Sequence, residues 1–259
     1  MPNDAVLLER DEGIATIRLN RPDNRNSMTP DLLSAFGEAV EEVAVAGDVR
    51  CVIVTGTGSS FCAGADFKSS RVDESKPPHE RQYELYSHFL RLAALEVPTI
   101  AAMNGHAIGG GLGLALVCDL RVANASARYG ANFVRLGLHP GMATTYLLPH
   151  FVGVPRALEL LLTGRIISGE EAAELGLANY AVPADEVMDR ATALASEIAS
   201  AAPIAVRWTK RAIYEGLEWR VERAARYEAM LQSRSMETKD FREGVSALLE
   251  KRPAKFSGR

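Results

Sequence analysis

The sequence predicts an α/β fold in which parallel strands alternate with helices. Three short apolar runs, at residues 51–55, 99–103 and 120–123, have the length and residue types of buried strands. Stretches with apolar residues at helical spacing separate these runs. Strands joined by helices run parallel and are connected by right-handed crossovers, so one mainly parallel sheet is expected.

The N-terminal segment predicts a β-hairpin followed by a helix. Residues 6–9 and 13–19 flank a turn, and in the second segment Ile14, Thr16 and Arg18 alternate with Ala15, Ile17 and Leu19. Thr29 supplies a capping hydroxyl, and Pro30 fits the first turn of a helix. The apolar residues that follow have helical spacing, and Gly47 predicts the end of this helix.

The C-terminal third predicts a series of helices. Ser168 followed by acidic residues resembles a capping box, and the helix it begins extends to Gly176. We place a boundary near residues 201–203, between a core of residues 1–200 and a C-terminal helical region of residues 201–259. The other predicted helices span residues 80–95, 110–117, 185–200, 203–215, 218–236 and 238–250.

The composition excludes several classes of protein. The 259 residues carry a net charge of −4 and no basic stripe, which argues against a nucleic-acid partner. No apolar run approaches the length of a membrane span, and no signal peptide is recognisable. Three cysteines argue against a disulfide framework, and no residues gather at metal-ligand spacing. A cytoplasmic protein without a metal or a membrane partner is therefore expected.

Two glycine-bearing turns are the most informative features. Residues 61–66 (FCAGAD) follow the first buried strand, and residues 104–111 (NGHAIGGG) follow the second and lead into a helix. Backbone N–H groups at a helix start lack intrahelical partners and suit an anion. Two such turns brought together would form a two-donor cradle for a developing oxyanion, which is a device for activating a carbonyl.

These turns, with other short motifs in order along the chain, resemble the crotonase superfamily, the enoyl-CoA hydratase/isomerase family. The resemblance runs nearly from end to end, and no single motif carries it. The supporting motifs are Asn20-Arg21-Pro22 with Arg25-Asn26, the two turns, Cys118-Asp119-Leu120-Arg121, Leu136-Gly137-Leu138-His139-Pro140-Gly141, Leu162-Thr163-Gly164, Gly176-Leu177-Ala178-Asn179 and Phe241-Arg242-Glu243-Gly244.

The resemblance implies a fold, a substrate and an assembly. It implies a ββα spiral core with a C-terminal helical trimerisation region that completes the site, and a homo-trimer or a hexamer built as a dimer of trimers. The oxyanion N–H groups would be those of Ala65 and Gly110, binding the thioester oxygen of an acyl-CoA. Coenzyme A would be part of the substrate, with no separate cofactor. The coenzyme A contacts map onto Arg25, Ala63, Ala65, Asp66, Phe67, Gly110 and Lys251.

The sequence departs from the family where the hydratases hold two catalytic glutamates. Gly113 and Phe133 stand at the two matching positions. Gly141, flanked by Met142, stands where several isomerases hold an acid. These four residues would line a remodelled substrate pocket, although simple repacking of the core would also explain Gly113 and Phe133.

His139 is the remaining candidate for acid–base catalysis. An imidazole titrates near neutral pH and could transfer protons without a carboxylate. His139 could instead cap its turn or face solvent, and the acid–base group could be a substrate group or another residue.

Three functions remain open from the sequence. The first is a crotonase-type acyl-CoA enzyme, a lyase or isomerase, that stabilises a thioester enolate. The second is a non-catalytic acyl-CoA-binding protein, and the third is a hydrolase of the carbon–carbon bond of β-diketones. A dinucleotide cofactor is not expected, because residues 109–116 do not satisfy G-x-G-x-x-G.

Overall fold

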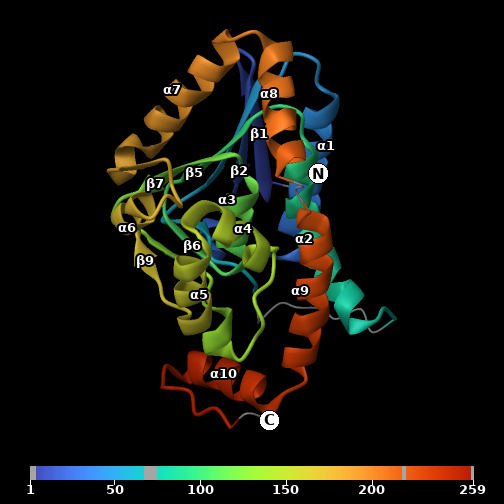
Figure 1. Ribbon diagram of the computed structural model, residues 1–259, viewed down its shortest axis with the longest axis vertical. Coiled ribbons are helices and arrows are strands. Elements are labelled where there is room, and N and C mark those ends of the chain that lie inside the picture. The colour runs from blue at the N-terminus through green and yellow to red at the C-terminus, as the bar shows by residue number, and fades with distance from the viewer. Residues whose placement is uncertain (1–3, 67–74, 218–219, 258–259) are drawn as a thin grey trace.

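The computed structural model (Figure 1) describes residues 4–66, 75–217 and 220–257. Its larger sheet has six strands in the order β1-β2-β3-β5-β7-β10. β1 and β2 form the predicted antiparallel hairpin, and every later neighbour pair is parallel. The strands are β1 (Val6–Asp11), β2 (Ile14–Leu19), β3 (Cys51–Gly56), β5 (Thr99–Met103), β7 (Leu120–Asn124) and β10 (Tyr180–Val182).

A second sheet of four short strands, β4-β6-β8-β9, lies beside the first. Its presence corrects the prediction of a plain turn at residues 104–111, because β6 occupies the middle of that segment. Three residues are too few to give a periodic pattern, so the sequence alone did not reveal β6. The strands are β4 (Ser60–Cys62), β6 (His106–Ile108), β8 (Arg128–Gly130) and β9 (Ile167–Ser168).

Two helices begin where Thr29 and Ser168 predict. The hydroxyl of Thr29 accepts a hydrogen bond from the N–H of Leu32 (3.4 Å), and the hydroxyl of Ser168 accepts one from the N–H of Glu171 (3.2 Å). The predicted helix at residues 80–95 is in fact α2 followed by a 3-10 turn, η2 (Arg91–Ala94). The helices are α1 (Pro30–Val45), α2 (Pro78–Leu90), α3 (Gly110–Val117), α4 (Thr144–Val152), α5 (Val154–Thr163), α6 (Gly169–Glu174), α7 (Val187–Ser200), α8 (Pro203–Gly216), α9 (Val221–Met236) and α10 (Lys239–Glu250); the other 3-10 turns are η1 (Pro22–Asn24), η3 (Phe133–Leu136) and η4 (Ala184–Glu186).

The larger sheet is buried on both faces. All residues of β3 and β5 are buried, which explains their continuous apolar sequences. α7 packs on one face through Val187, Ala191 and Ala195. α1 lies on the other side, and the edge-to-face rings of Phe36 and Phe89, 4.8 Å apart, join it to α2.

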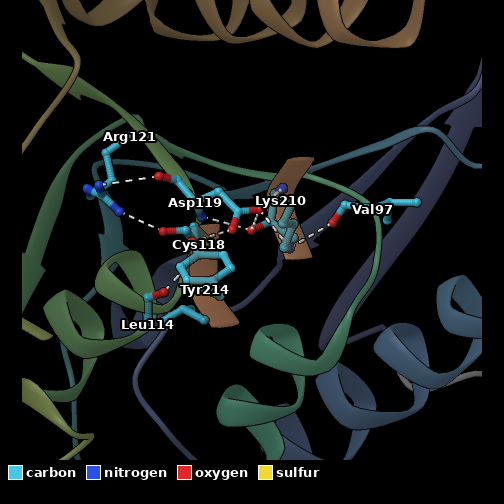
Figure 2. A network of polar contacts seen from close by, with 8 residues as sticks. Val97, Leu114, Cys118, Asp119, Arg121, Lys210 and Tyr214 are labelled. Carbon is cyan, nitrogen blue, oxygen red and sulfur yellow. Dashed lines mark hydrogen bonds and ion pairs between the residues drawn. The ribbon is translucent and has the colours of Figure 1, made fainter. Parts of the chain in front are cut away.

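A buried polar network ties α8 to the sheet (Figure 2). The carboxylate of Asp119 accepts hydrogen bonds from the N–H of Thr99 (2.7 Å) and the hydroxyl of Tyr214 (2.5 Å). It also pairs with the ammonium of Lys210 (2.8 Å), which donates in addition to the carbonyl of Val97 (2.9 Å). Charged groups that are shielded from water must be paired and hydrogen-bonded to be stable. This network therefore fixes the position of α8 relative to the sheet.

Candidate active site

The two glycine-bearing turns meet in the structure. A Cβ on Gly64 would lie 2.6 Å from the carbonyl oxygen of Ile108 and 3.2 Å from the backbone nitrogen of Gly110. A Cβ on Gly111 would overlap the carbonyl of Cys62. Only glycine allows the two backbones to approach this closely. The structure therefore brings Ala65 and Gly110 into one neighbourhood.

Both predicted oxyanion donors are available. Gly110 is the first residue of α3, so its N–H has no partner within the helix. Ala65 forms an isolated bridge with Met28, in which the N–H of Met28 donates to the carbonyl of Gly64 (2.8 Å). Ala65 itself is exposed. Within residues 4–66, 75–217 and 220–257, no hydrogen bond from the N–H of Ala65 or Gly110 is found.

The residues predicted to hold coenzyme A are only partly together. The carbonyl of Arg25 accepts a hydrogen bond from the N–H of Ala63 (3.0 Å), so the exposed Arg25 lies beside the turn that carries Ala65 and Asp66. Lys251 is also exposed, but it ends α10, which packs on η3. Phe67 lies outside the described residues.

Methionine and phenylalanine side chains occupy the space beside α3. A Cβ on Gly113 would overlap the Cβ of Met142 and lie 3.0 Å from its Cγ. A Cβ on Gly109 would lie 3.8 Å from Cζ of Phe133. Met142 is fully buried and Phe133 is 8% exposed. The surroundings of Gly113 are therefore apolar, and the buried Phe133 lies close to Gly109 at the start of α3.

The position of Gly141 faces polar groups from two other helices. A Cβ there would overlap the hydroxyl of Tyr86, from α2, and would lie 3.1 Å from Nε2 of Gln232, from α9. The Tyr86 hydroxyl donates a hydrogen bond to Oε1 of Gln232. Burial and the nearby carboxylate of Glu228 raise the pKa of Tyr86 well above its ordinary value. Tyr86 is therefore a neutral hydrogen-bonding group beside Gly141.

Two residues of α9 bind the backbone of His139. The backbone N–H of His139 donates to the hydroxyl of Ser235 (3.0 Å), and its backbone carbonyl accepts from Nε2 of Gln232 (3.0 Å). Its ring Nδ1 lies 2.7 Å from the carbonyl oxygen of Pro140. Because a carbonyl can only accept, Nδ1 carries the proton and Nε2 is the acceptor atom. Burial lowers the pKa of His139, which favours this neutral form.

Glu228 is a buried acid that the sequence analysis missed. Its Oε1 accepts hydrogen bonds from the N–H (2.7 Å) and the hydroxyl of Thr145, at the start of α4. Burial raises the pKa of Glu228 to about 7, and the N–H groups of Ala143 and Thr144 oppose that rise. A signal existed in the sequence: Val221, Ala225, Glu228 and Gln232 share one face of α9 by spacing, which puts a charged residue on a buried stripe.

Comparisons with known proteins agree on one family. The enoyl-CoA hydratase/isomerase family profile matches residues 9–259. Human mitochondrial enoyl-CoA hydratase domain-containing protein 2 is 42% identical over 98% of this chain and 89% of its own length. The crotonyl-CoA hydratase of Syntrophomonas wolfei subsp. wolfei (strain DSM 2245B / Goettingen) is 37% identical over 99% of both chains. The crystal structure of an enoyl-CoA hydratase/isomerase from Pseudoalteromonas atlantica T6c superposes with a TM-score of 0.88, at 29% identity, over 98% of this chain and 100% of the other.

The chain belongs to the enoyl-CoA hydratase/isomerase family. The resemblance to the crotonase superfamily and the α/β fold class are thereby confirmed.

Cys62 and His106 belong to the two glycine-bearing turns, and their side chains are respectively buried and hydrogen-bonded to the backbone. Burial raises the pKa of the Cys62 thiol to about 12, so this cysteine is not a ready thiolate nucleophile. Nδ1 of His106 accepts a hydrogen bond from the N–H of Arg128 (3.0 Å), which gives it a structural role. The described residues contain no group of side chains able to hold a metal ion, and no described helix is long and apolar enough to cross a membrane. A cavity of about 700 Å³ between η2 and α8 includes none of the predicted site residues.

Proposed function

We propose that this protein is an acyl-CoA enzyme that stabilises a thioester enolate between the N–H groups of Ala65 and Gly110. The close approach of the two glycine-bearing turns, with both N–H groups without partners in the described chain, is the observation that carries the proposal. Donors fixed by the backbone need no rearrangement when negative charge develops on the substrate oxygen. The names of the relatives, which include a crotonyl-CoA hydratase, support an acyl-CoA thioester as the substrate.

His139 is the proton-transfer group in this proposal. Its neutral ring offers Nε2 as a base, and the bond from Nδ1 to Pro140 fixes the tautomer. The lowered pKa keeps the ring neutral at physiological pH. Proton removal from the carbon next to the thioester would place the electron pair on the oxygen held by Ala65 and Gly110.

The proposed coenzyme A contacts are Arg25, Ala63 and Asp66, with Lys251 and Phe67 as further candidates. Arg25 is exposed and adjoins the first oxyanion turn, so its guanidinium can reach a phosphate without a burial cost. Lys251 belongs to another part of the fold. A role for it fits best in a homo-trimer or hexamer, where a neighbouring subunit contributes to the site.

Removal of the Gly110 N–H tests this function. Proline is tolerated at the first position of a helix, and the thioether of Met28, which a new Cβ would meet, is flexible. We expect Gly110→Pro to lower kcat/KM toward acyl-CoA substrates by roughly 10²- to 10³-fold, the usual effect of losing one oxyanion donor. Turnover of crotonoyl-CoA and a panel of other acyl-CoA thioesters, followed by mass spectrometry, is the measurement.

Gly110→Ala is the matched control, because it adds the same Cβ and keeps the N–H. Equal losses in the two variants would show that the new Cβ, rather than the missing donor, is responsible, and would contradict the proposal.

A non-catalytic acyl-CoA-binding protein is the second candidate. The observation that favours it is that the apolar side chains of Met142 and Phe133 occupy the space beside α3, where a hydratase would need a carboxylate. Tight binding of acyl-CoA thioesters without turnover of any of them would establish this function instead.

A further inference from the structure

We propose that Met142 is a reaction-specificity residue, whose side chain fills the space over Gly113 and keeps water away from the acyl carbons beside the Gly110 donor. The inference rests on the proposed function. In this role, Met142 favours reactions of acyl-CoA thioesters that proceed by proton transfer alone over reactions that add water.

The position of Met142 supports this role directly. Its Cβ and Cγ lie against Gly113, and its Cγ would be 3.7 Å from a Cβ on Gly110. The side chain is fully buried, as are Gly110 and Gly113. A thioether offers no strong hydrogen bond, so a water molecule at this wall would lack partners.

Phe133 adds a second apolar side chain near the donor. Its ring edge would be 3.8 Å from a Cβ on Gly109, the residue before the oxyanion donor, where Oδ1 of Asn132 would lie at 3.9 Å. Met142 and Phe133 thus place apolar groups beside Gly110 and beside Gly109. Exclusion of water strengthens the hydrogen bonds to an enolate oxygen and removes the nucleophile that hydration requires.

The backbone that carries Met142 is strained. Met142 and Ala143 both have left-handed conformations, with φ of 60° and 56°. Such conformations cost roughly 1–2 kcal/mol for each residue with a side chain and persist only where the surroundings enforce them. Something must therefore hold this turn.

Glu228 supplies the restraint. Ala143 precedes α4 without a side-chain cap of its own, and the carboxylate of Glu228 takes that role from α9 by accepting from Thr145. The N–H groups of Ala143 and Thr144 also face this carboxylate. Glu228 is thus a positioning residue that keeps Met142 over Gly113.

Movement of a double bond by proton transfer needs only the substrate and the groups already described. His139 takes a proton from the carbon next to the thioester, and the electron pair of that C–H bond forms the enolate. In a β,γ-unsaturated acyl-CoA, the enolate re-forms the carbonyl as the proton returns to the γ carbon. The double bond has then moved, and no oxidant, water or further reactant is consumed.

Four proteins test the role of Met142: the natural chain, Gly113→Glu, Gly113→Glu/Met142→Gly and the matched control Gly113→Glu/Met142→Leu. Glycine at position 142 removes the Cβ that a side chain at position 113 would overlap, whereas leucine keeps it. A carboxylate at position 113 can activate water only where residue 142 leaves room for the carboxylate and the water molecule. We expect hydration of crotonoyl-CoA by the glycine double variant to exceed that by the other three at least tenfold. Equal hydration by Gly113→Glu alone would overturn the proposal. A folded glycine double variant that binds crotonoyl-CoA without this gain would overturn it as well.

Thermal unfolding tests the steric claim without relying on activity. Overpacking a buried site costs about 1–3 kcal/mol, which lowers the Tm of a chain of this size by several degrees. We expect Gly113→Glu to lower the Tm of the natural chain by roughly 5 °C, and to lower the Tm of Met142→Gly by less, because glycine removes the overlapping Cβ. An unchanged Tm in Gly113→Glu would show that Met142 does not fill this space.

A further substitution separates this inference from the proposed function. Gly110→Pro in the Gly113→Glu/Met142→Gly variant must abolish the gained hydration if the N–H of Gly110 stabilises the enolate. Hydration that survives Gly110→Pro would contradict the oxyanion proposal while leaving the role of Met142 supported.

Discussion

At the scale of single residues, the site depends on glycines, which have no side chain, as much as on residues with side chains. Gly64 and Gly111 let two backbones approach, and Gly113 leaves room for Met142. Each substitution by a larger residue would displace a neighbour that is itself buried. Glu228 is the opposite case, a large charged group taken out of water and held by the first N–H groups of α4.

The titration of Glu228 should make stability depend on pH. Its pKa rises from an ordinary 4.5 to about 7 in the folded protein, so the folded state binds the proton more tightly than the unfolded state. The resulting stabilisation is complete below pH 4.5 and is lost as the pH rises to about 7, by roughly 3 kcal/mol in all. Glu228→Gln, which can still accept from Thr145, should remove this dependence.

Chemical denaturation between pH 5 and pH 8 measures the effect of Glu228. The exposed Glu197, changed to Gln, is the matched control and should leave the pH dependence as it is in the natural chain. Parallel pH profiles for Glu228→Gln and the natural chain would contradict the assignment.

At the scale of elements, α9 organises the site from outside the sheet. Glu228, Gln232 and Ser235 all bond to the segment between His139 and Thr145. α8 has a different role. It is joined to the sheet mainly through Lys210 and Tyr214, and none of its described residues is buried. The position of α8 therefore depends on a polar network rather than on a hydrophobic face.

Asp119→Asn should loosen α8 selectively. Both side chains of the Asp119–Lys210 pair are shielded, at 15% and 11% exposure, so loss of the carboxylate leaves a poorly solvated ammonium and costs several kcal/mol locally. Hydrogen exchange of α8 amides should accelerate at least tenfold, while exchange in β3 stays slow. Arg211→Gln, which breaks the exposed pair with Glu215, should change little. Uniform acceleration across the chain would instead indicate global destabilisation.

At the scale of the whole molecule, the described surface leaves large apolar side chains in water. On α8, Ile204 is 62% and Trp208 69% exposed. Exposed apolar side chains gathered on one element are typical of an association surface. They support the proposed homo-trimer, which the family resemblance implies.

Trp208→Glu should weaken the assembly. Sedimentation velocity of the natural chain should give the mass of a trimer or hexamer, and Trp208→Glu should shift the population toward monomer at micromolar concentration. Val45→Glu is the control, because Val45 is 85% exposed at the end of α1. A natural chain that sediments as a monomer would contradict the proposed trimer.

The sequence by itself determined the family, the parallel sheet and the two turns of the candidate oxyanion site. Those features depend on local signals: apolar runs of strand length, Thr29 and Ser168 as caps, and glycines where the backbone must turn. Such signals can be recognised in a sequence because each depends only on residues that are close together along the chain.

Only the tertiary structure decided what surrounds those turns. Met142 over Gly113, Tyr86 against Gly141 and Glu228 at the start of α4 each join residues distant in sequence or in separate elements. No periodic pattern encodes such contacts, since they arise only when separate elements of the chain pack together. For this reason the sequence could place Gly113 and Phe133 at the expected glutamate positions, and only the fold showed that Met142 lies against Gly113.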